Sequence, residues 1–193
     1  KNGSNAFFDP DNKLGLSREA LYFIGGLIKH AKGLAAITNP LVNSYKRLTS
    51  GYEAPVYIAW SHRNRSPLIR IPIARGDSTR IELRSPDPSC NPYLAFAAVL
   101  SAGMDGIKRK ITPPDPVNEN IYDMDEAQLK KFGIECLPSS LKEALDELKK
   151  DQVLQDSLTE HIISNYTRAK YQEWECYSLQ VHPWELTQYL STY

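Results

Sequence analysis

The sequence predicts an α+β fold, in which antiparallel strands form part of a larger sheet and pack against helices. Three observations support this prediction. Apolar residues recur at helical spacing over residues 17–33, and an alanine-rich apolar run covers residues 93–110. Between these two runs, three short segments are rich in β-branched and aromatic residues and are separated by polar turns. Helical patterns return after residue 140, so we also expect a helical C-terminal region.

The first helix is predicted over residues 17–33. Ser17 suits its N-cap, because the hydroxyl can accept a hydrogen bond from the first turn, and Gly33 suits its end. Gly25 and Gly26 weaken the helix by about 1 kcal/mol each. The residues at helical spacing on its apolar face are Leu21, Ile24, Leu27, Ile28 and Ala31.

A long exposed loop is expected over residues 38–55, where Pro and Gly interrupt regular structure. The three strands are then predicted at residues 56–60, 68–73 and 79–83. Because only polar turns connect them, we expect them to pair in an antiparallel arrangement.

The second helix is predicted over residues 93–110. Asn91 and Pro92 suit the N-cap and the first helical position. Its alanine-rich apolar composition indicates a helix buried on most sides. A proline-rich linker, residues 112–118, is expected to end this part of the chain.

The C-terminal region is predicted to contain two helices and a short tail. Ser140 and Glu143 match a capping box that opens a helix to about residue 150, and a longer helix follows over residues 152–179. The aromatic tail, residues 182–193, has too few apolar positions to form its own core. We therefore expect the tail to dock, for example on another subunit.

The composition excludes several classes of protein. The 193 residues favour a single domain, and 23 basic residues balance 23 acidic ones, so no global charge recruits nucleic acid or an anionic membrane. No apolar run approaches the ~20 residues that span a bilayer. The three cysteines, Cys90, Cys136 and Cys176, are widely spaced and fit neither a disulfide framework nor a zinc site. We expect a soluble, cytoplasmic protein, and the turn-like start of the chain indicates a piece of a longer one.

Arginine is concentrated around the predicted strands. Alternation along residues 80–84 sends Arg80, Glu82 and Arg84 to one face of a strand. This pattern has two interpretations: a salt-bridged row on a solvated face, or a site for an anionic substrate with a metal-bound phosphate. The cations that favour the second interpretation are Lys46, Arg47, Arg63, Arg65, Arg70, Arg75, Arg80 and Arg84.

Five segments in order and at matching spacing resemble glutamine synthetases of type I, the bacterial and archaeal branch. The resemblance extends over the whole chain, including its aromatic tail. The five segments are Asn43-Ser44-Tyr45-Lys46-Arg47-Leu48 with Gly51-Tyr52-Glu53-Ala54-Pro55, Asn64-Arg65-Ser66, Ile69-Arg70-Ile71-Pro72, Arg80-Ile81-Glu82-Leu83-Arg84, and Asp87-Pro88 with Asn91-Pro92-Tyr93-Leu94.

The resemblance implies that residues 1–193 form the C-terminal portion of a glutamine synthetase catalytic domain, without the N-terminal domain and the first part of the catalytic domain. It implies ATP-dependent ligation of ammonia to glutamate through a γ-glutamyl phosphate, with the piece inactive alone. In the family the intact enzyme is a homo-oligomer, a dodecamer of two hexameric rings. Two alternatives remain open: a γ-glutamyl-amine ligase of the same family, and a non-catalytic relative used for assembly or binding.

The resemblance also implies roles for individual residues. Arg47 and Arg84 are expected to bind glutamate, Arg65 to neutralise the moving phosphoryl group and contact ATP, and Arg70 and Arg80 to contact ATP.

Two carboxylates complete the expected site. Glu82 is expected to bind Mg²⁺ or Mn²⁺. Glu53 is expected to close over glutamate on a flexible flap and to take a proton during amide formation. Tyr122 resembles a tyrosine that some type I enzymes modify with AMP, and relatives without that modification also carry a tyrosine there. Asp77 stands where some family members carry a basic nucleotide contact, which leaves the ATP contacts of this loop less defined.

Overall fold

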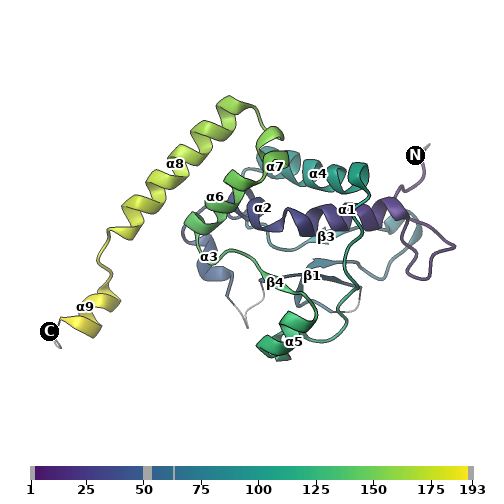
Figure 1. Ribbon diagram of the computed structural model, residues 1–193, viewed down its shortest axis with the longest axis horizontal. Coiled ribbons are helices and arrows are strands. Elements are labelled where there is room, and N and C mark those ends of the chain that lie inside the picture. The colour runs from purple at the N-terminus through teal and green to yellow at the C-terminus, as the bar shows by residue number, and fades with distance from the viewer. Residues whose placement is uncertain (1–2, 50–53, 63, 191–193) are drawn as a thin grey trace.

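A computed structural model of the chain describes residues 3–49, 54–62 and 64–190 (Figure 1). In this part of the chain, one small sheet packs against a layer of helices, which confirms the α+β class. None of the described helices is both long and apolar enough to cross a membrane. The helices of the layer are α1 (Arg18–Lys29), α2 (Ala31–Thr38), α4 (Pro92–Arg109), α6 (Leu141–Lys150) and α7 (Gln152–Asp156).

The sheet has four strands in the described residues, in the order β3-β2-β1-β4. The predicted antiparallel pairing holds for β2 with β3, but β1 and β2 run parallel, with Tyr57 beside Pro67 and Ser61 beside Arg70. β1 also pairs antiparallel with β4, a strand that the sequence did not predict. The strands are β1 (Tyr57–Ser61), β2 (Pro67–Arg70), β3 (Glu82–Leu83) and β4 (Glu135–Cys136).

The connection from β1 to β2 is held against a later segment. The Asn64 amide group donates hydrogen bonds to the carbonyl oxygens of Val117 (3.1 Å) and Glu119 (2.8 Å). Because β1 and β2 run parallel, they do not form the expected hairpin. All five residues of β1 are buried, as is typical of strands covered on both faces. The segment 112–118, predicted as a linker, packs on β1, since the Val117 amide donates to the Trp60 carbonyl at 2.9 Å.

The third strand is shorter than predicted. Only Glu82 and Leu83 pair, and a 3-10 turn (Gly76–Ser78) precedes them. The Asn5 side chain donates to the carbonyl oxygens of Asp77 (3.1 Å) and Thr79 (2.8 Å). These bonds hold the segment before Glu82 against the N-terminal loop and away from the sheet. β4 was not predicted, because two exposed residues carry no readable alternation.

The helix predicted over residues 17–33 is two helices. Ser17 caps α1 as predicted, and its hydroxyl accepts a hydrogen bond from the Ala20 amide at 3.1 Å. The break falls at His30, and α2 continues through Gly33. Gly33 does not end the helix; its missing side chain leaves room for Leu154, which would lie 2.9 Å from an added Cβ.

The prediction of an exposed loop over residues 38–55 is partly wrong. It contains the short helix α3 (Ser44–Arg47), and Tyr45 and Leu48 are buried. The Tyr45 hydroxyl donates to the carbonyl oxygen of Ala35 at 3.3 Å, so α3 is fastened to α2. Glu53 lies outside the described residues.

Helix α4 begins as predicted, with the Asn91 side chain accepting from the amides of Tyr93 and Leu94. It packs closely on α1, because a Cβ added to Gly26 would lie only 2.2 Å from the Ala102 carbonyl oxygen. The prediction of burial on most sides is wrong for one face. Apolar residues exposed on that face are Tyr93, Phe96, Leu100 and Met104.

The C-terminal helices also differ from the prediction. Ser140 caps α6, whereas the Glu143 carboxylate accepts from the Ser139 amide rather than from Ser140. The helix predicted over residues 152–179 is broken into α7 and α8 (Glu160–Ser178), because Thr159 starts a new helix as its N-cap. α8 packs against α6 and α2, because the Tyr171 hydroxyl donates to an Asp146 carboxylate oxygen at 2.7 Å and the Tyr166 hydroxyl donates to the Ala36 carbonyl oxygen at 2.6 Å. α9 (Pro183–Tyr189) lies at the far end of α8, and α5 (Glu126–Lys131) lies near the sheet (Figure 1).

Candidate functional site

A cavity of about 600 Å³ brings together three of the arginines singled out in the sequence. Arg47 comes from α3, Arg65 from the connection between β1 and β2, and Arg84 from the segment after β3. Within the described part of the chain, no acidic residue lines this cavity. Its lining residues are Arg47, Asn64, Arg65, Ser66, Arg84, Asn120 and Tyr122.

Arg84 is held by the main chain of the neighbouring strand. Its amide donates to the Leu68 carbonyl at 3.0 Å, and its guanidinium donates to the carbonyl oxygens of Pro67 (3.1 Å) and Arg65. Burial lowers the pKa of Arg84, and the positive charges of Arg70 and Arg65 lower it further, although Tyr122 and Glu82 act in the opposite direction. Arginine remains protonated in proteins, so a bound anion would relieve this crowding of positive charge.

Arg47 is anchored to the residue that follows Arg84. Its guanidinium donates to the Ser85 carbonyl oxygen at 3.0 Å, and the Asn39 side chain donates to the same oxygen at 2.8 Å. Two separate segments of the chain thus meet at one carbonyl group. This shared contact fixes the spacing between Arg47 and Arg84 across the cavity.

Arg65 lies between two residues that are tied to a later segment. Asn64 donates to Val117 and Glu119, and the Ser66 hydroxyl accepts a hydrogen bond from the buried Ile121 amide at 3.2 Å. The Arg65 side chain itself is exposed. The main chain of Arg65 is therefore fixed on both sides while its guanidinium remains accessible to a ligand.

Glu82 lies between the other two predicted ATP contacts. Arg70 and Glu82 are paired residues of β2 and β3, and the Arg70 Nε lies 3.5 Å from a Glu82 carboxylate oxygen. Arg80 contacts the other carboxylate oxygen through Nε at 2.9 Å and Nη2 at 2.8 Å. Arg80 lies outside β3 but its guanidinium still contacts Glu82. The side chains of Arg70, Arg80 and Glu82 therefore form one charged cluster although the strand is short.

The described residues offer little to a metal ion. Glu82 is partly exposed and could provide one oxygen ligand. Across residues 3–49, 54–62 and 64–190, no group of three or more His, Cys, Asp or Glu residues is arranged to hold a metal. Glu82 is therefore not part of such a group within these residues.

Tyr122 is a cavity residue that the sequence did not identify as one. Its ring packs against that of Tyr57, with centroids 5.8 Å apart, and the Asn120 side chain accepts from its amide. Burial raises the pKa of Tyr122, although Arg84 acts against the rise, so the phenol stays neutral near pH 7. Tyr122 thus adds a neutral hydroxyl to a cavity that is lined by arginines. Only the fold brings Tyr122 to Arg84, and no local pattern could have shown this.

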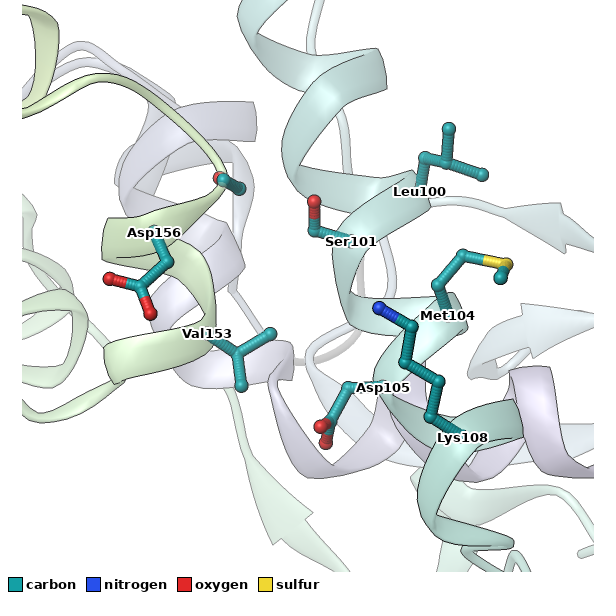
Figure 2. A pocket seen from close by; sticks show the side chains of 8 residues that line it. Leu100, Ser101, Met104, Asp105, Lys108, Val153 and Asp156 are labelled. Atoms are coloured by element: carbon teal, nitrogen blue, oxygen red, sulfur yellow. The ribbon is translucent and has the colours of Figure 1, made fainter.

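A second cavity, of about 410 Å³, lies between α4 and α7 (Figure 2). Its lining includes Leu100, Met104 and Asp105 from α4 and Val153 and Asp156 from α7. None of the predicted site residues lines it. The arginine cavity therefore remains the candidate site.

Comparison with known proteins identifies the family. The model of the glutamine synthetase catalytic domain matches residues 1–189. The glutamine synthetase of Thermotoga maritima is 62% identical over 186 residues, covering 96% of this chain and 42% of that protein. The glutamine synthetase of Methanosarcina mazei is 56% identical over 191 residues, covering 99% of this chain and 43% of that protein.

Solved structures agree with the sequence comparison. A GmaS/ADP complex is 39% identical and superposes with a TM-score of 0.84, covering 96% of this chain and 42% of that one. The chain thus spans less than half the length of the relatives it matches. It belongs to the glutamine synthetase catalytic-domain family.

Proposed function

We propose that this chain is part of an enzyme that ligates ammonia to glutamate, with ATP as the second substrate, to give glutamine. The observation that supports this most is the cavity lined by Arg47, Arg65 and Arg84, beside the cluster of Arg70, Arg80 and Glu82. Forked guanidinium groups suit both the carboxylates of glutamate and the phosphates of ATP.

The reaction has two steps. In the first, a side-chain carboxylate oxygen of glutamate attacks the γ-phosphorus of ATP, and the bond to ADP breaks. Arg47 and Arg84 hold the glutamate, while Arg65, Arg70 and Arg80 contact the nucleotide and stabilise the charge on the transferred phosphoryl group. The fixed main chain on both sides of Arg65 supports such a positioning role.

In the second step, the nitrogen of ammonia attacks the carbonyl carbon of γ-glutamyl phosphate, and the bond to phosphate breaks. The nitrogen then loses a proton. Glu53 is our candidate for the base that accepts it and for the lid over the substrate, although it lies outside the described residues.

The family's divalent ion, Mg²⁺ or Mn²⁺, fits this chain in part. Glu82 would supply one oxygen ligand, and the ion would offset negative charge on the phosphates. The remaining ligands would come from the rest of a longer polypeptide, of which residues 1–193 form the C-terminal portion of the catalytic domain. We include in this proposal a cytoplasmic location and a dodecamer of two hexameric rings. The exposed apolar residues of the tail, among them Trp184 and Leu190, support docking of the tail on another subunit.

The proposal is tested with the complete polypeptide that contains this chain. It is incubated with glutamate, ATP and Mg²⁺, and with ammonia, methylamine or ethylamine, and the products are identified by mass spectrometry. We expect glutamine to form fastest. A preference for an amine would favour a γ-glutamyl-amine ligase, and no product from any nucleophile would favour a non-catalytic relative.

The isolated chain provides the matching control. Because it offers one metal ligand within the described residues, we expect no turnover by the 193-residue chain alone under the same conditions. Rapid glutamine formation by the isolated chain would show that the remaining ligands are not needed.

A further inference from the structure

A buried histidine joins three helical segments at a site that the proposed reaction does not use. The His30 side chain is 4% exposed and lies at the junction of α1 and α2. Its Nδ1 is 2.6 Å from an oxygen of Asp151, and its Nε2 is 3.0 Å from an oxygen of Asp105. Asp105 belongs to α4 and Asp151 separates α6 from α7. We call these three residues the His30 clasp.

Both partners of His30 are carboxylates. A neutral imidazole carries one N–H and could donate to only one of them, whereas an imidazolium donates through both nitrogens. Asp151 uses its other oxygen to accept from the Leu154 amide at 3.2 Å, which caps α7. Two charge-assisted hydrogen bonds are therefore available only when His30 carries both ring protons.

The alternative is a neutral histidine with a protonated carboxylic acid. The surroundings of Asp105 oppose it, because Lys29 lies 3.5 Å and Arg109 3.7 Å from the same carboxylate oxygen. Burial alone would raise the pKa of Asp105, but the hydrogen bond from His30 and the charge of Lys29 outweigh it, and the net shift is downward. Asp105 is thus a carboxylate.

The pKa of His30 shifts in the matching direction. Burial would lower it, but the hydrogen bonds and charges of Asp151 and Asp105 outweigh burial and raise it. The remaining charged groups nearby do not reverse this balance, since Lys32 pairs with Glu135 and Lys150 pairs with Glu147, each within 2.7 Å. The groups that face the clasp from the surrounding elements are Lys29 from α1, Lys32 from α2, Arg109 from α4, and Glu147 and Lys150 from α6.

We propose that His30 is a buried imidazolium that fastens the α1–α2 junction to α4 and to the α6–α7 junction, and that this fastening is lost when rising pH removes its second ring proton. Because the folded state raises the pKa of His30, the clasp stabilises fully below the unfolded value of about 6.5. Its contribution disappears as the pH rises through the folded value. The clasp is therefore a pH-sensitive contact that stabilises the packing of the helical layer.

The clasp has a structural connection to the arginine cavity. It fixes the start of α2, and the residues at the other end of that helix support the segment after Arg84. The Thr38 carbonyl accepts from the Asp87 amide at 3.0 Å, and the Asn39 side chain donates to the Ser85 carbonyl. Opening of the clasp should reduce the hydrogen-exchange protection of the Leu34 amide, which is bonded to the His30 carbonyl.

Nuclear magnetic resonance of the imidazole nitrogens tests the protonation directly. The 193-residue chain is labelled with ¹⁵N, and the His30 signals are assigned by their absence from His30→Gln. At pH 6.5 we expect both ring nitrogens to carry protons and the titration midpoint to lie above 6.5. A midpoint at or below 6.5, or a single ring proton, would overturn the proposal.

Urea unfolding at two pH values tests the fastening. We expect the urea midpoint of His30→Gln to lie well below that of the wild type at pH 6. The difference between the two midpoints should be smaller at pH 9. The matched control is His161→Gln on α8, where the histidine is exposed; its midpoint should follow the wild type at both values. A gap that is equal at pH 6 and pH 9 would mean that His30 acts by packing and would overturn the proposal. If His30→Gln does not fold, Asp105→Asn replaces it in the same comparison.

Discussion

The arginine cavity and the His30 clasp are both charged clusters, but they balance their charge in different ways. In the described residues, three arginines line the cavity without an acidic residue. The clasp places one histidine between two carboxylates, each no more than 15% exposed. An open cluster with excess positive charge is suited to bind an anion, whereas a closed cluster in which opposite charges pair is suited to hold helices together. Substitutions in the two places should therefore separate activity from stability.

The largest effect is expected for Arg84→Ala in the complete polypeptide. If the Arg84 guanidinium binds the substrate anion as proposed, its loss should reduce glutamine formation by about 100-fold or more, because such preorganised charge is worth this much in enzymes. Steady-state assays with varied glutamate measure it. Arg168→Ala on α8, whose guanidinium contacts Asn165, is the control. Activity within twofold of the wild type for Arg84→Ala would remove this residue from the site.

The next effect is a loss of stability in Asp151→Ala. The change removes the α7 cap and leaves the buried His30 with one carboxylate, and we expect unfolding to become easier by about 3 kcal/mol near pH 6. Urea unfolding measures it. The control is Asp156→Ala on the same helix, where the carboxylate is exposed. Equal midpoints for the two variants would contradict a structural role for the clasp.

The acid side of the stability profile depends on Asp105. Its lowered pKa means that its contribution is present above the unfolded value of about 3.9 and is lost as the pH falls through the folded value. We expect Asp105→Asn to cost about 2 kcal/mol near pH 6, since a hydrogen bond to a charged group is lost. The difference from the wild type should shrink in acid. Urea unfolding curves from pH 6 to pH 3 measure this. A stability difference between Asp105→Asn and the wild type that stayed constant over this range would contradict the role of the Asp105 carboxylate.

The smallest effect is expected from Glu82→Gln on stability. Glu82 is 30% exposed and Arg80 is 54% exposed, so solvent screens the pairing and the change should cost less than about 1 kcal/mol. Thermal unfolding of the isolated chain measures it. A loss as large as that of Asp151→Ala would make the salt-bridged row around Glu82 a structural feature and would weaken the contrast between the two clusters.

Features that depend on neighbouring residues were predictable from the sequence. Ser17, Asn91 and Ser140 each cap a helix as expected, because an N-cap bonds to amides two or three residues away. The gathering of Arg47, Arg65 and Arg84 was expected through the family resemblance, and the cavity bears out their proximity. Their roles remain predictions.

Features that depend on distant residues were not predictable. His30 is 75 positions from Asp105 and 121 positions from Asp151, so no local pattern joins them. The connection between the parallel strands β1 and β2 is held by Asn64, whose amide group bonds to a segment more than 50 positions away. In α4, apolar composition predicted burial but could not show that the face with Tyr93 and Phe96 is exposed.

The most direct test of the proposed site is Arg65→Gln in the complete polypeptide. Because the Arg65 side chain is exposed, the substitution should change the free energy of unfolding, measured in urea, by no more than about 0.5 kcal/mol, as is usual for surface changes. We predict that the same protein forms glutamine from glutamate, ammonia and ATP about 100-fold more slowly than the wild type. Glutamine formation at the wild-type rate, with the fold unchanged, would contradict it.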